Sequence, residues 1–203
     1  QGEDIDKLLK YMETIESSAQ KAGALAKDLS GLSKKRMLEN GAIAPIDINR
    51  LIAEVQRLIS DTFPKNIEVS AVMNNNIPLI KGDATQLEHA LLNIAINSKD
   101  AMPDGGKLTI KTFVTDSVSG HSKHPYLKAG KYATIQISDT GTGMDEETLN
   151  HIFEPFFTTK PVDKGTGLGL ATVYSIIKAH RGYVIAESIP DKGSTFTIYL
   201  PIE

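Results

Sequence analysis

Polar side chains recur at helical spacing near the middle of the chain. Asn93, Asn97 and Asp100 follow at steps of four and three within an apolar segment, so a helix places them on one face. Asparagine disfavours helix interiors because its amide competes for backbone hydrogen bonds. Amide and carboxylate oxygens are hard ligands that suit a hydrated Mg²⁺ bridging phosphates. The spacing therefore indicates a cation site, although a solvated helix face explains the same residues when they are taken alone.

Two glycine-rich segments lie further along the chain. Asp139–Gly143 follows a strand of alternating character, and its carboxylate can accept a hydrogen bond from an exocyclic amine such as adenine N6. Its glycines let the backbone approach a flat ring closely, although a tight turn capped by an aspartate has the same sequence. Gly165–Gly169 precedes a helix, whose first N–H groups and dipole attract an anion. The spacing matches neither a P-loop nor the dinucleotide-binding fingerprint.

Aromatic and small polar residues separate the two glycine segments. Half of the six phenylalanines of the chain, Phe153, Phe156 and Phe157, fall within this short stretch, and Thr158-Thr159-Lys160 follows. Aromatic residues at one end and glycines at the other are typical of a mobile lid over a ligand. A partly buried loop is the alternative interpretation.

The elements that must position these motifs begin near residue 46. Asn49 can cap a helix that ends before Pro64, and Asp83–Gln86 resembles a capping box that opens a helix to about Met102. A short helical segment is predicted at 146–153, and a third helix from Gly169 to about His180. Strands are predicted at 67–73, 77–81, 107–115, 132–138, 183–188 and 195–200. Three helices with five or so largely consecutive strands predict one sheet covered on a single face, an α+β sandwich.

The first 45 residues have a different pattern. Apolar residues occupy successive heptad a and d positions from Ile5 to Leu29. So narrow a stripe requires a helical partner in water, which favours a coiled coil or four-helix bundle in a dimer over a helix docked on its own domain. Asn40-Gly41 and Pro45 end the helix. We expect a helix with a linker over residues 1–45 and a second domain over residues 46–203.

The composition excludes several kinds of chemistry. Apolar residues make up 40% and charged residues 23%, as in ordinary globular proteins. The absence of cysteine excludes disulfides, thiolate zinc sites, iron–sulfur clusters and cysteine nucleophiles. A net charge of −3 gives no sign of nucleic-acid binding. No apolar run is long enough to span a membrane, and the start at Gln1-Gly2-Glu3 is expected of a piece of a longer protein.

The order of these motifs is similar to that of a known family. Asn-x₃-Asn, Asp-x-Gly-x-Gly, the phenylalanine-rich segment and Gly-x-Gly-x-Gly resemble the catalytic and ATP-binding domain of sensor histidine kinases, within the GHKL ATPase superfamily. The resemblance covers about residues 46–203 and includes the closing Gly193-Ser194-Thr195 strand. It implies a two-layer α/β sandwich, in which a mixed sheet carries three helices on one face and ATP with Mg²⁺ binds under a flexible lid.

The resemblance also implies a role for individual residues. Asp139 is expected to bind the adenine amine, Asn97 to coordinate Mg²⁺ with Asn93 beside it, and Lys160 or Lys164 to reach the γ-phosphate. Asn93 and Lys160 are the expected catalytic residues. The other expected nucleotide contacts are Asp100, Gly141, Gly143, Met144, Phe156, Thr158, Thr159, Gly165, Thr166, Gly167, Leu168, Gly169, Leu170 and Thr195. Leu168 and Leu170 are also read as core contacts of the helix that they open.

Asparagine at position 93 points to the kind of reaction. ATP-hydrolysing relatives place a glutamate there to activate water, and asparagine cannot act as that base. Transfer of the γ-phosphoryl group to a protein nucleophile is therefore favoured. A GHKL serine kinase, a hydrolysing ATPase and a non-catalytic nucleotide-sensing dimer are the alternatives.

The same resemblance implies partners outside the chain. Residues 3–39 look like the second helix of a dimerising hairpin, through which the intact protein forms a homodimer. None of the five histidines lies in that region, so the phosphoacceptor histidine is expected outside this chain. The phosphate then passes to an aspartate of a response regulator receiver domain. The domain is expected in the cytoplasm, with any membrane attachment through other parts of the protein, and His121-x-x-His124 is interpreted as a solvated loop.

Overall fold

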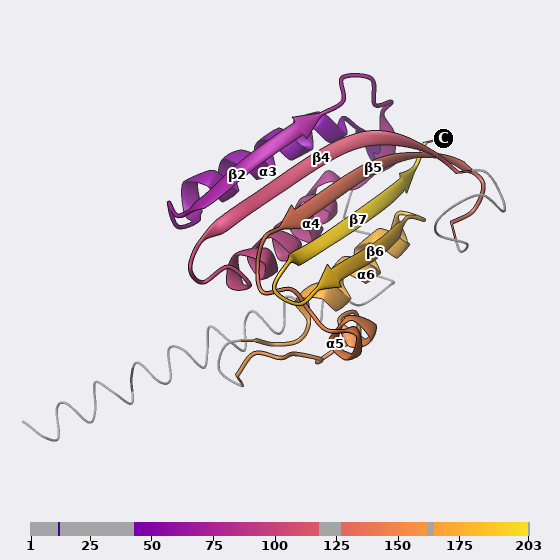
Figure 1. The fold of residues 1–203 in the computed structure, drawn as a ribbon. Coiled ribbons are helices and arrows are strands. Elements are labelled where there is room, and N and C mark those ends of the chain that lie inside the picture. Colours follow the sequence, from indigo (N-terminus) through magenta and orange to yellow (C-terminus); the bar gives the residue numbers. More distant parts are fainter. Residues whose placement is uncertain (1–11, 13–42, 118–126, 162–164, 203) are drawn as a thin grey trace, which may run out of the picture.

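A mixed five-stranded sheet organises the computed structural model, which describes residues 12, 43–117, 127–161 and 165–202 (Figure 1). Its strand order is β2-β4-β5-β7-β6, in which β2 pairs parallel to β4 and all other neighbours are antiparallel. The strands are β2 (Ile67–Met73), β4 (Gly106–Ser117), β5 (Gly130–Asp139), β6 (Tyr183–Ile189) and β7 (Gly193–Pro201). The predicted heptad helix over residues 3–39, the His121–His124 loop and Lys164 lie outside the described residues, apart from Met12.

Three helices cover one face of this sheet. They are α3 (Ile48–Thr62), α4 (Ala84–Asp100) and α6 (Gly169–Ala179), while the short α5 (Glu146–His151) lies beyond the end of the sheet (Figure 1). Alternate strand residues turn inward and meet the apolar faces of the helices. This core includes Ile52, Val55, Leu87, Leu91, Ile94, Leu108, Ile110, Ile135, Ile137, Val173, Ile177, Phe196 and Ile198. The predicted α+β sandwich with three helices on one face is confirmed.

The strand predicted at 77–81 does not join the main sheet. The observed β3 (Ile80–Gly82) pairs antiparallel with β1 (Ala44–Ile46) in a separate two-stranded sheet. Strand β1 was not predicted, because three residues that include Pro45 give no usable alternation. The small sheet leads directly into α4 through Asp83.

Helix α3 starts with a different cap from the predicted one. Asp47 Oδ1 accepts hydrogen bonds from the backbone N–H groups of Asn49 (2.9 Å) and Arg50 (3.2 Å). Asn49 is therefore not the cap. Its amide instead donates to Asn74 O at 2.7 Å and accepts from Thr112 Oγ1 at 2.8 Å, which joins α3 to the strands.

The start of α4 contains only part of the predicted capping box, because the backbone N–H of Asp83 donates to His180 Nε2 and not to the Gln86 side chain. Asp83 Oδ1 accepts from the backbone N–H groups of Thr85 (3.0 Å) and Gln86 (3.2 Å), and Gln86 Nε2 donates to Asp83 Oδ2 at 3.0 Å. These bonds satisfy N–H groups that have no partner within the helix.

Among the described residues, no helix is both long and apolar enough to cross a membrane.

Candidate functional site

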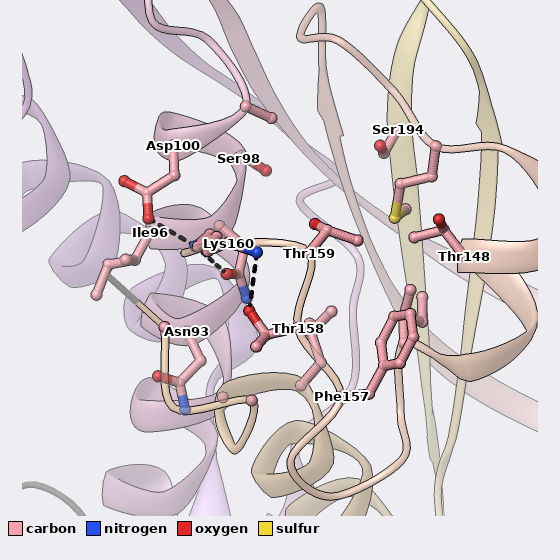
Figure 2. A pocket seen from close by; sticks show the side chains of 18 of the residues that line it. Asn93, Ile96, Ser98, Asp100, Thr148, Phe157, Thr158, Thr159, Lys160 and Ser194 are labelled. Atoms are coloured by element: carbon pink, nitrogen blue, oxygen red, sulfur yellow. Dashed lines mark hydrogen bonds and ion pairs between the residues drawn. The ribbon is translucent and has the colours of Figure 1, made fainter. Parts of the chain in front are cut away.

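A pocket of about 780 Å³ opens between the second half of α4, the start of α6 and the segment that joins α5 to α6 (Figure 2). The end of β5 with its following loop and the start of β7 close one side. This volume lies within the usual range of small-molecule sites, which is about 300–1,000 Å³.

Asp139 occupies one end of the pocket and is only 6% exposed. Its Oδ1 accepts from the backbone N–H groups of Gly141 (2.9 Å) and Ser194 (3.1 Å), and its Oδ2 accepts from Ser98 Oγ (3.0 Å). Three donors on one carboxyl group define it as an acceptor of fixed orientation. Because an ionised carboxylate offers about four acceptor positions, it retains the capacity to bind one more donor.

At the other end of the pocket, two side chains of α4 direct oxygen atoms at the ammonium group of Lys160. Lys160 Nζ donates to Asn97 Oδ1 at 3.0 Å and to Asp100 Oδ2 at 2.7 Å (Figure 2). Burial by itself raises the pKa of the Asp100 carboxyl group. The hydrogen bond and charge of Lys160, together with Lys99 at 3.4 Å, nevertheless hold this pKa below its ordinary value. Asp100 is thus ionised at neutral pH.

Asn93 lies one helical turn before Asn97 and also lines the pocket. Its Nδ2 is buried and has no hydrogen-bond partner among the described residues. A buried donor without a partner costs free energy.

Two glycines let the loops around the pocket pass close to neighbouring backbone. Gly167 has φ 66°, and a Cβ there would lie 2.3 Å from the carbonyl carbon of Phe156. Gly143 has φ 65°, and a Cβ there would lie 2.1 Å from Ile189 O. Any side chain at either position would therefore displace the loop as well as strain the backbone.

The start of α6 faces the pocket. Gly169 is its first residue, and the side chain of the N-cap residue Leu168 makes no capping hydrogen bond. The first N–H groups of a helix have no partner within it and carry the positive end of its dipole. This end of α6 is therefore suited to an anionic group.

Most of the predicted site residues come together around this pocket. Those that line it are Asn93, Asn97, Asp100, Asp139, Gly143, Met144, Thr158, Thr159, Lys160, Gly165, Thr166, Gly167, Gly169 and Leu170. Gly141 lies behind the lining, where its N–H group holds Asp139. Lys164 lies outside the described residues.

Three further predicted contacts do not line the pocket. Leu168 is fully buried in the protein, in keeping with its reading as a core residue, and Phe156 is 64% exposed. Thr195 lies on the outer face of the sheet, where its hydroxyl bonds Ser138 Oγ at 3.0 Å. Because residues alternate between the faces of a strand, Ser194 lines the pocket in place of Thr195.

Several residues that form the pocket wall were not predicted from the sequence. They are Ile96, Ser98, Ala101, Thr142, Thr148, Ile152, Phe157, Ser194 and Phe196. The alternation of β7 and the position of Phe157 within the phenylalanine-rich segment were available signals for Ser194 and Phe157. No local pattern marks Ser98, because its partner Asp139 is distant in the sequence.

Comparison with known proteins defines the class to which this fold and pocket belong. Residues 82–203, more than half of the chain, match the family described as "Histidine kinase-, DNA gyrase B-, and HSP90-like ATPase". The chain therefore belongs to this family, and the resemblance drawn from the four motifs is confirmed.

Individual relatives are named as kinases. Sensor kinase CckA of Brucella abortus (strain 2308) is 36% identical over 92% of this chain, and sporulation kinase A of Bacillus subtilis (strain 168) is 32% identical over 94%. The chain spans 20% and 29% of the lengths of these two relatives. Among solved structures, the catalytic domain of histidine kinase ThkA superposes with a TM-score of 0.63 at 28% identity, over 78% of this chain and 95% of that one.

Proposed function

We propose that this chain is the catalytic part of a sensor histidine kinase, which binds Mg·ATP and transfers the γ-phosphoryl group to a histidine outside the chain. One observation carries the proposal. The same pocket has a buried carboxylate acceptor, Asp139, at one end and side chains suited to a metal-bound phosphate at the other. The family match supports ATP as the ligand.

The end with Asp139 would recognise the base. The carboxylate is held by Gly141, Ser194 and Ser98, so its remaining acceptor capacity has a fixed direction. Adenine carries an exocyclic N–H donor, whereas guanine carries a carbonyl oxygen at the corresponding ring position. An ionised acceptor at this place therefore favours adenine.

The opposite end of the pocket fits a divalent cation and phosphates. Asn97 and Asp100 present the oxygen ligands that Mg²⁺ prefers, and these atoms already converge on the ammonium group of Lys160. When bound, Mg²⁺ would neutralise charge on the phosphate oxygens. The N-terminal amides of α6 and the ammonium group of Lys160 are the chain's own groups for the remaining phosphate charge.

Asn93 separates phosphoryl transfer from hydrolysis. Its buried amide can donate a hydrogen bond but cannot take a proton from water. In the proposed reaction, a nitrogen of the acceptor histidine forms a bond to the γ-phosphorus as the bond to the bridging oxygen breaks and ADP leaves. The pocket contributes position and charge neutralisation rather than a base.

The partners of the intact protein follow from the same proposal. Residues 1–45 would form one helix of a dimerising hairpin, so that two chains form a homodimer. The phosphate would then pass to an aspartate of a response regulator receiver domain. The kinase domain would act in the cytoplasm, and any membrane anchor would lie elsewhere in the protein.

The decisive experiment supplies the missing histidine. The chain is mixed with Mg·ATP labelled at the γ-phosphate and with a separately prepared helical hairpin that carries an acceptor histidine, together with a matched hairpin in which that histidine is replaced by glutamine. Label on the first hairpin alone, labile to acid and stable to base, supports the proposal. Steady release of inorganic phosphate without protein label, abolished by Asn93→Ala, would identify a hydrolysing ATPase instead.

A further inference from the structure

His180 links two helices at the end of the molecule remote from the pocket. It is the C-cap residue of α6 and is half-buried. Its Nδ1 lies 2.8 Å from Ile176 O, and its Nε2 lies 2.9 Å from the backbone nitrogen of Asp83, the N-cap residue of α4. Because a backbone N–H group can only donate, Nε2 is the acceptor, and Nδ1 carries the proton that it donates to Ile176 O. Both ring nitrogens of a neutral imidazole are therefore engaged.

The imidazole ring also rests against the small two-stranded sheet. A Cβ built on Gly82 would lie 2.6 Å from His180 Cδ2, so the last residue of β3 must lack a side chain for the ring to fit. Gly82 pairs with Ala44 of β1. The end of α6, the start of α4 and the β1–β3 pair thus meet at one side chain.

The same two helices meet again inside the pocket. The end of α6 contacts the start of α4, and the start of α6 lies beside the second half of α4. The two helices therefore run antiparallel (Figure 1). There, a Cβ on Gly169 would lie 3.7 Å from Asn97 Nδ2. About 21 Å of helix separates Asp83 from Asn97 at 1.5 Å per residue. The remote contact therefore limits how far α6 can slide along α4.

The contact is not needed to start α4. The Asp83 carboxylate accepts from the backbone N–H groups of Thr85 and Gln86, and Leu87 and Leu91 anchor the helix in the core. Loss of the imidazole acceptor would free the position of α4 relative to α6 rather than unfold either helix.

We propose that His180 is a positioning residue of the pocket. Acting through the backbone of Asp83, it holds α4 and α6 in the register that brings Asn97 and the first amides of α6 to the same phosphate group. The identity of that ligand rests on the proposed function above, whereas the register of the helices does not.

Two substitutions separate the two bonds of the imidazole. In His180→Gln, the side-chain oxygen reaches about as far as Nε2 and can accept from the Asp83 N–H group. In His180→Asn, the shorter amide can replace only Nδ1 and leaves Asp83 without its acceptor.

We expect the affinity for Mg·ATP, measured by calorimetry on the whole chain, to fall at least about fivefold in His180→Asn and to stay within about twofold in His180→Gln. His89→Asn, which changes another half-buried histidine on α4, is the matched control and should bind like the wild type.

A second measurement follows the register directly. Amide NMR signals of the Asn97 side chain and the Gly169 backbone should shift in His180→Asn and should keep their wild-type positions in His180→Gln. Equal affinities and equal spectra for the two variants, or an equal loss in both, would overturn the proposal. If the wild type fails to bind Mg·ATP, the proposed function is refuted, and the NMR comparison alone then decides whether His180 sets the register.

Discussion

The replacement Asp139→Asn tests how the pocket recognises a base. The new side chain has the same size, and its oxygen can still accept from the N–H groups of Gly141 and Ser194, at 2.9 and 3.1 Å in the wild type. Its NH₂ group would occupy the place of Oδ2, where the Ser98 hydroxyl can rotate and accept instead of donating. The folded structure should therefore lose less than about 1 kcal/mol of stability.

The effect on nucleotide binding should be larger. The exocyclic amine of adenine loses an ionised acceptor, and a hydrogen bond to a charged group is worth about 1.5–3 kcal/mol. This corresponds to about 10- to 150-fold weaker binding of ATP. Inosine triphosphate carries an oxygen in place of that amine and can accept from the new NH₂ group. The ratio of ATP affinity to inosine triphosphate affinity should therefore fall by at least about tenfold.

Titration calorimetry with both nucleotides measures this ratio, and thermal unfolding verifies that the variants are folded. Glu187→Gln provides the matched control, because it removes the same charge from an exposed residue that faces Thr195 across β6 and β7. The control should bind both nucleotides like the wild type. An unchanged affinity ratio in folded Asp139→Asn would refute the assignment of this end of the pocket to the base.

Other predictions concern the phosphate end of the pocket and its loops. Lys160→Met keeps the aliphatic stem without the charge and should slow phosphoryl transfer at least about tenfold in the labelled-hairpin assay. The pKa of the Asp100 carboxyl group is lowered in the folded protein, so its pairing with Lys160 stabilises the fold above about pH 4 and is lost as the pH falls through the folded pKa. The difference in free energy of unfolding between the wild type and Asp100→Asn should accordingly shrink below about pH 4 in urea titrations; a constant difference would contradict it. Gly143→Ala forces a Cβ to within 2.1 Å of Ile189 O and should destabilise by about 1–3 kcal/mol in denaturant unfolding. Phe156→Gly replaces an exposed side chain at φ 69° and should change the same free energy by less than about 1 kcal/mol.

Features that depend on neighbouring residues could be predicted well. The Asp83 cap of α4, the helical spacing of Asn93, Asn97 and Asp100, and the alternation at the end of strand β5 all arise within one or two turns or a few strand positions. Their partners are close in the sequence, so the pattern contains the interaction. The four motifs in order indicated the family, and the family match confirmed it.

Features that depend on distant partners could not be predicted. Residues 44–46 form a strand only because β3 lies beside them, and Ser98 contributes to the pocket only because Asp139 ends a strand next to α4. Even the cap of α3 was assigned to Asn49 rather than Asp47, because both residue types favour that position and only the backbone geometry selects between them.

By itself, the sequence of this protein determined the types of chemical group and the elements that carry them. Carboxylate, amide, lysine and glycine residues appear at spacings set by helix and strand periods, and those periods are local. Only the tertiary structure decided which of these groups face one another. Several hydrogen bonds join segments that are far apart in the chain. They connect Thr195 with Ser138 on the outer face of the sheet, Lys160 with Asn97 and Asp100, and His180 with Asp83. Such contacts depend on how the helices and the sheet pack together, and no local pattern records that packing.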